Sequence, residues 1–214
     1  WAPHLCGDQH LAVVVQHGIE AHNDGPYGFT SPALVNTIYG RWWHPEDEKA
    51  GPNPVAGSPL PWTGNYVDGL GNKIRMLAYA NPVDRSDERK RSDGYGIARF
   101  RKSTRQVTFE CYQRFSDLAA DKNKGQFPGW PVTLHISAND GRKIFAKLPE
   151  IKVPDTEHPV YQVINETTGE ILYTTRAEAA TIKAAVYGPG KYTVKAGRDR
   201  PEKTLLHRFE VKAK

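Results

Sequence analysis

Asp8 and His10 are the two residues whose types and spacing best suit metal chemistry. They belong to the tetrapeptide Gly-Asp-Gln-His at residues 7–10, directly after the short segment His4-Leu5-Cys6. A glycine followed by Asp and His two positions apart allows a sharp loop from which both side chains can face one ion. Carboxylate oxygen and imidazole nitrogen suit iron, zinc or manganese. A second interpretation stays open, because Asp is also a common turn residue.

Other histidines are concentrated near the same end of the chain, and five of the eight lie in the first 44 residues. His17 ends an apolar segment, and we expect a solvated or capped side chain there rather than a third metal ligand. His22 and His44 flank a segment rich in Gly and Pro. We expect both to lie at the surface.

Arg41, Trp42 and Trp43 are the candidates for contact with a substrate. A guanidinium group suits phosphate, but the same group can stack on an indole ring, and we favour packing over binding. Ser31 has no Gly-X-Ser-X-Gly sequence around it, so serine nucleophile chemistry is not expected. The sequence also has no phosphate-binding glycine loop and no dinucleotide fingerprint.

The stretch Gly7-Asp8-Gln9-His10-Leu11 resembles the C-terminal metal-binding motif of alkaline phosphatase D (PhoD-like) phosphatases, a family of calcineurin-like metallophosphoesterases. The similarity to secreted PhoD-like proteins continues to about residue 135, and its clearest segments are 28–36, 39–43, 61–64, 68–73 and 78–82. The resemblance implies a β core flanked by helices, a two-metal site on loops at strand ends and hydrolysis of a phosphoester substrate. It implies that Asp8 and His10 bind Fe, Zn, Mn or Ca, and that the protein is extracellular or periplasmic.

The upstream metal-binding motifs of the family are absent from this sequence. Two ligands cannot hold the pair of ions that such a hydrolase needs. We therefore interpret the chain as a C-terminal portion that lacks its N-terminal portion, and we expect it to be inactive alone. The alternative is a non-catalytic extracellular binding or assembly module, in which Asp8 only caps a turn.

Composition and charge narrow the possible partners. With 38% hydrophobic and 25% charged residues, the chain has an ordinary globular composition. No apolar run approaches the roughly 20 residues of a membrane helix, so we expect no membrane span. The net charge of +5 comes from residues 191–214, which hold eight basic and three acidic residues. We expect a strand pair with a basic solvent face there rather than a nucleic-acid site.

Alternation of apolar and polar residues predicts a mainly β chain with some α/β character and long loops. In the first part, expected strands cover 11–15 and 74–79, and a hairpin joins 94–100 to 106–112, with Val107, Phe109 and Cys111 on one face. Residues 23–72, rich in Gly, Pro and Trp, predict a long functional loop. The two cysteines, Cys6 and Cys111, either pair, remain buried thiols or, for Cys6, lie beside the metal site.

From about residue 151 the pattern changes to short strands separated by turns, which predicts a small antiparallel β-sandwich-like domain. The expected strands are 160–165, 170–175, 180–184, 191–195 and 207–212. We place the domains at 1–140, the C-terminal part of a metallophosphoesterase β-sandwich core, and 141–214.

Overall fold

The structure is a computed structural model that describes residues 2–34, 51–81, 92–117, 119 and 125–213. It consists of two compact units, Trp1–Gly141 and Arg142–Lys214, each with its own hydrophobic core. Strands form nearly all of the secondary structure, and the described residues contain one helix, the short 3-10 helix η2 (Ile136–Asn139). The expected mainly β fold is therefore confirmed.

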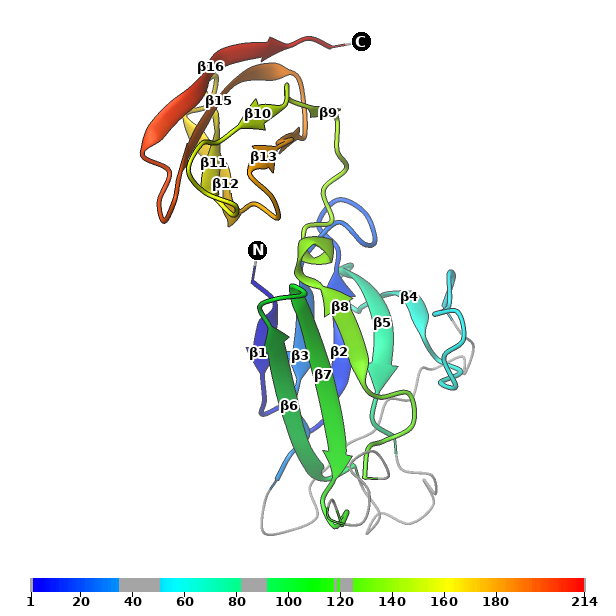
Figure 1. Ribbon diagram of the computed structural model, residues 1–214. Coiled ribbons are helices and arrows are strands. Elements are labelled where there is room, and N and C mark those ends of the chain that lie inside the picture. Colours follow the sequence, from blue (N-terminus) through cyan, green and yellow to red (C-terminus); the bar gives the residue numbers. More distant parts are fainter. Residues whose placement is uncertain (1, 35–50, 82–91, 118, 120–124, 214) are drawn as a thin grey trace. The chain divides into compact units, whose positions relative to one another are not determined.

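A five-stranded sheet carries the N-terminal motif (Figure 1). Its order is β1-β3-β2-β5-β4; β1 is parallel to β3, and the other neighbours are antiparallel. The strands are β1 (His4–Cys6), β2 (Val13–His17), β3 (Tyr27–Thr30), β4 (Gly64–Val67) and β5 (Lys73–Tyr79). The strand expected at 74–79 is confirmed. The strand expected at 11–15 begins two residues later, because the loop that holds Asp8 and His10 extends to Ala12.

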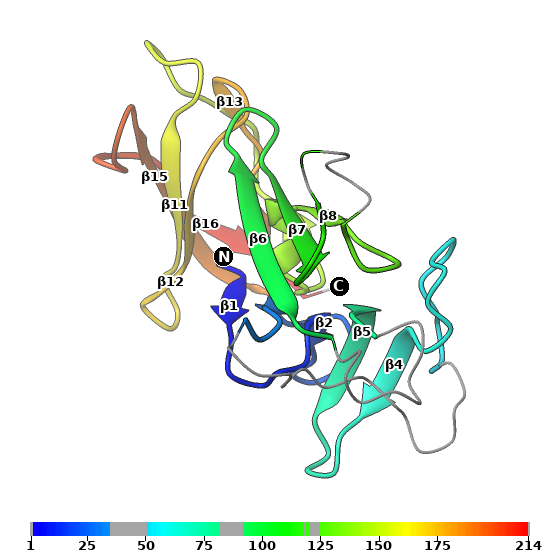
Figure 2. The same cartoon turned by 90° about the horizontal axis from the view of Figure 1, so that it is seen from below.

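A three-stranded sheet lies against the first one, as the two perpendicular views show (Figures 1 and 2). It contains β6 (Gly94–Arg101), β7 (Gln106–Gln113) and β8 (Val132–His135), and β6 and β7 form the expected hairpin. Val107, Phe109 and Cys111 are buried between the sheets, because alternate residues of a strand face the same side. This unit is a two-layer β-sandwich whose core also contains Val14, Phe29 and Trp130.

The second unit is built on an antiparallel sheet of order β12-β11-β15-β16. Its strands are β11 (Val160–Asn165), β12 (Glu170–Arg176), β15 (Gly190–Gly197) and β16 (Lys203–Val211). Val163 of β11 lies opposite Val194 of β15, and both side chains are fully buried.

The single strand expected at 180–184 is wrong. The chain there forms two short strands with different partners: β13 (Thr181–Ile182) pairs with β10 (Ile151–Lys152), and β14 (Ala185–Val186) pairs with β9 (Ala146–Lys147). Ile182 and Ala184 are both buried, so this segment lies against the main sheet instead of extending it.

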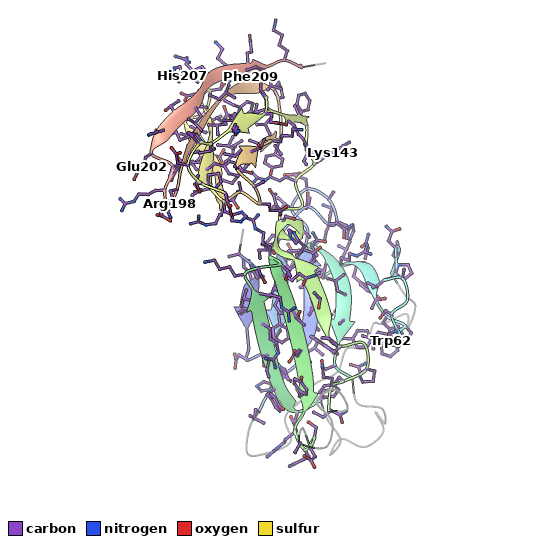
Figure 3. All side chains as sticks on the ribbon, in the orientation of Figure 1. Trp62, Lys143, Arg198, Glu202, His207 and Phe209 are labelled. Carbon is purple, nitrogen blue, oxygen red and sulfur yellow. The ribbon has the colours of Figure 1, made fainter. Side chains whose placement is uncertain are left out.

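Six basic residues at the C-terminal end lie on β15, on β16 and in the turn between them, and Lys212 directly follows β16. Figure 3 shows Arg198 and Glu202 at the tip of this hairpin and His207 on β16. Arg198, Lys203 and Arg208 are exposed, and β16 is an edge strand of its sheet. Charged side chains on an edge strand hinder pairing with another chain. Across the described residues, no helix has the length and apolar character needed to cross a membrane.

Candidate functional site

Asp8 and His10 lie in the loop that connects β1 to β2. Because β3 lies between these strands in the sheet, the loop crosses from one side of β3 to the other. The backbone N–H of Gln9 donates to the carbonyl of Gly7 at 2.9 Å, which makes a tight turn. The sequence thus places both candidate ligands at one end of the sheet, directly after β1.

The backbone of this loop is unusual. Asp8 has φ 69° and His10 has φ 58°. Non-glycine residues rarely adopt this left-handed conformation, although Asp and His do so more often than most. In the part of the chain that the structure describes, no other two non-glycine residues spaced two apart share it. Such conformations cost about 1–3 kcal/mol each and are concentrated at functional sites.

Both side chains are accessible from solvent. Asp8 is exposed and His10 is half-buried. Beside Gly7, a cleft of about 370 Å³ opens between β1 and β6. Its walls come from both sheets, and its lining residues are Leu5, Cys6, Gly7, Phe29, Ser31, Gly96 and Ala98. The Oγ of Ser31 accepts a hydrogen bond from the N–H of Gly96 at 3.1 Å, so this residue links the two sheets.

The loop carries two side chains of types that bind metal ions, Asp8 and His10. A carboxylate and an imidazole suit a borderline or hard divalent ion. No group of three or more His, Cys, Asp and Glu side chains suited to one ion occurs within residues 2–34, 51–81, 92–117 and 125–213. The described residues therefore supply two candidate ligands to this site, and no reaction step can be derived from them alone.

The other residues expected at a site have different outcomes. Arg41, Trp42, Trp43 and His44 lie outside the described residues. His22 is half-buried, and a ring nitrogen lies 2.9 Å from the carbonyl oxygen of Tyr66 on β4. The expected surface position of His22 is thus only partly correct, because the side chain connects the loop after β2 to an edge strand.

The solvated or capped state expected for His17 is only partly correct. Its ring is half-buried and lies 5.9 Å from the ring of His4 on β1, measured between ring centroids. Burial lowers the pKa of His17, and the neighbouring His4 lowers it further. Strand alternation alone did not reveal this pair, because the two residues meet across β3.

Sequence reasoning also missed the environment of Glu110 on β7. Glu110 is only 9% exposed although it faces away from the sandwich core. Its carboxylate accepts from Nε of Arg99 at 2.6 Å and from the hydroxyl of Tyr112 at 2.9 Å. Burial raises the pKa of Tyr112, and the hydrogen bond to Glu110 raises it further. Both carboxylate oxygens of Glu110 are hydrogen-bonded, so this cluster is explained by stability.

The two cysteines do not pair. Cys6 is exposed on β1, and its Sγ lies 3.2 Å from Oγ1 of Thr30. Cys111 is buried in the sandwich core, where desolvation raises the pKa of its thiol. The expected pairing and the expected two buried thiols are therefore both wrong, and the position of Cys6 beside a metal site stays a prediction.

A comparison with known proteins adds no relative. No protein-family model, no curated protein and no solved structure matches the chain.

Proposed function

We propose that this chain is the distal part of a metal-dependent phosphoester hydrolase of the PhoD-like type, in which Asp8 and His10 form one edge of the metal site. The substrate class is a phosphomonoester or phosphodiester outside the cytoplasm. The remaining ligands come from a further portion of the protein, N-terminal to this one.

The observation that carries the proposal is the left-handed backbone at both Asp8 and His10. A loop whose only task is to connect β1 to β2 gains nothing from two unfavourable conformations at alternate positions. A loop that must hold a carboxylate and an imidazole for one ion has a reason to keep both conformations. The position of the loop after a strand that runs parallel to its neighbour agrees with this role, since ligand sites of metallohydrolases lie on loops at strand ends.

The chemistry assigned to such a site is the activation of water and the neutralisation of charge on the phosphate. This chain supplies two of the metal ligands, Asp8 and His10, and holds them in position. The cleft beside Gly7 offers space next to them, with walls that are mainly apolar.

The test is an elemental analysis of the purified protein after equilibration with Fe, Zn, Mn or Ca. The variant Asp8→Ala/His10→Ala should hold about one ion per chain less than the wild type. A matched control removes Asp155 and His158, an exposed pair from the second unit in which Asp155 also has a positive φ.

Equal metal content in the wild type and in Asp8→Ala/His10→Ala would contradict the proposal. Asp8 would then be better explained as a turn residue, and the chain as a non-catalytic binding module.

A further inference from the structure

His4 and His17 approach each other across β3. His4 on β1 lies opposite Gly28 on β3, and His17 ends β2 on the other side of that strand. Their rings are 5.9 Å apart between centroids, with 42° between the ring planes. Both residues are outside the loop that carries Asp8 and His10.

Gly28 provides the space in which the two histidines meet. A Cβ atom added at Gly28 would lie 2.9 Å from Nε2 of His17, closer than a normal contact. The imidazole of His17 therefore extends over the backbone of β3 toward β1. With any larger residue at position 28, the ring could not keep this place.

The separation of the rings fits two ligands of one ion. Metal–nitrogen bonds of about 2.0–2.1 Å place the centroids of two imidazoles on a shared ion roughly 4.5–6.4 Å apart, for bond angles from 90° to 180°. The observed separation of 5.9 Å lies in this range. Imidazole pairs select borderline ions such as Zn²⁺, Ni²⁺ and Cu²⁺ over Mg²⁺ or Ca²⁺.

The surroundings keep the pair available to an ion. His4 is exposed, so solvent reaches one side of the pair and water can complete the coordination. The thiol of Cys6, two residues after His4 on the same strand, already contacts Thr30 and the carbonyl of Phe29.

We propose that His4 and His17 form a two-histidine site for a borderline divalent transition-metal ion, with Zn²⁺ as the reference ion and water in the remaining positions. The site is separate from the proposed edge at Asp8 and His10 and does not depend on that function.

The test is a calorimetric titration of Zn²⁺ into the whole chain without a histidine tag. The starting protein carries Asp8→Ala, His10→Ala and Cys6→Ser, so the other candidate ligands near β1 are absent. One Zn²⁺ should bind per chain. His4→Ala and His17→Ala should each weaken Zn²⁺ binding by about 10- to 100-fold or more. Loss of a residue that only hydrogen-bonds to a metal ligand already has an effect of about that size.

Two further variants separate a metal site from a general effect on stability. Gly28→Ala keeps both histidines but displaces the ring of His17, so it should weaken Zn²⁺ binding at least about tenfold. His207→Ala removes an exposed histidine from β16 in the second unit and should leave the affinity unchanged.

Several results would overturn the proposal. The first is that the starting protein binds no Zn²⁺. The second is that the Zn²⁺ affinity is unchanged in both His4→Ala and His17→Ala. The third is that His207→Ala weakens Zn²⁺ binding as much as these two variants do. Because Asp8 and His10 are absent throughout, failure here leaves the proposed function untouched. The unfolding midpoint is measured for every variant, so that a loss of Zn²⁺ binding caused by a destabilised fold is recognised.

Discussion

The ring of Phe29 on β3 stacks on the ring of Phe109 on β7, with 5.0 Å between the centroids and 26° between the planes. This contact joins the two sheets of the first unit at the centre of its core. Phe29 also lies 5.7 Å from Trp130, again between ring centroids, and it lines the cleft beside Gly7. The core of the sandwich and the cleft beside Gly7 therefore share the same aromatic residue.

Truncation of this contact should destabilise the first unit. Phe109→Ala removes a fully buried ring and leaves a cavity, so we expect the free energy of unfolding to fall by about 3–5 kcal/mol. Denaturant unfolding followed by tryptophan fluorescence measures the change. The control is Phe115→Ala, at a ring that is 88% exposed, which should change the stability by less than about 0.5 kcal/mol. Equal effects of the two variants would show that the sandwich core is wrongly assigned.

Asp24 should make the loop after β2 sensitive to acid. Its carboxylate accepts from the backbone N–H groups of Ile19, Glu20 and Ala21 at 2.6, 2.9 and 2.8 Å. These hydrogen bonds, led by the one from Ile19, lower the pKa of Asp24. The stabilisation is therefore fully present above the ordinary Asp pKa of 3.8 and is lost as the pH falls through the lower folded-state value.

The variant Asp24→Asn tests this account by amide hydrogen exchange. At neutral pH, the amides of Ile19, Glu20 and Ala21 should exchange faster in the variant than in the wild type. Below the folded-state pKa of Asp24 the difference should disappear. A difference that is constant from neutral pH to pH 2 would mean that the charge of Asp24 does not hold the loop.

The two thiols should differ in reactivity. Cys6 is exposed, whereas Cys111 is buried and its thiol pKa is raised, so little thiolate forms. In the native protein at pH 8, one thiol per chain should react rapidly with a disulfide reagent, and Cys6→Ser should remove that reaction. The second thiol should react only after unfolding. If no thiol reacts rapidly in the native protein but two thiols react after reduction, the protein contains a disulfide that the structure does not.

The chain alone should not hydrolyse phosphoesters. Asp8 and His10 cannot hold two metal ions, and the described residues offer them no third ligand of the His, Cys, Asp or Glu type. With p-nitrophenyl phosphate or the bis ester and Fe, Zn, Mn or Ca, the rate should equal that of the metal in buffer. A metal-dependent rate that disappears in Asp8→Ala/His10→Ala would contradict this expectation, because the site would then be complete without further residues.

Local patterns predicted two hairpins whose strands are close in sequence, but they missed β3 and β4, which lie within residues 23–72, expected to be a long loop. The hairpin of β6 and β7 followed from alternation that buries Val107, Phe109 and Cys111, and β11 and β12 followed from two short strand patterns separated by a turn. The two-residue strands β9, β10, β13 and β14 were missed or merged, because segments of that length carry no periodicity and depend on partners about 30–40 residues away.

The candidate sites show the same limit. The types and spacing of Asp8 and His10 were readable from the sequence, but their left-handed backbone was not. The meeting of His4 and His17 depends on the register of β1 against β3 and on the missing side chain of Gly28. The burial of Glu110 depends on partners on two strands, Arg99 and Tyr112, that no periodicity identifies.

The most direct test of the metal role of Asp8 and His10 is an anomalous difference map from a crystal of this chain soaked in Mn²⁺. Mn²⁺ suits a carboxylate better than Zn²⁺ does, which favours this site over the histidine pair. We predict a peak within roughly 2.0–2.6 Å of a carboxylate oxygen of Asp8 and a ring nitrogen of His10. A map with Mn²⁺ bound elsewhere and none between these two residues would contradict the account.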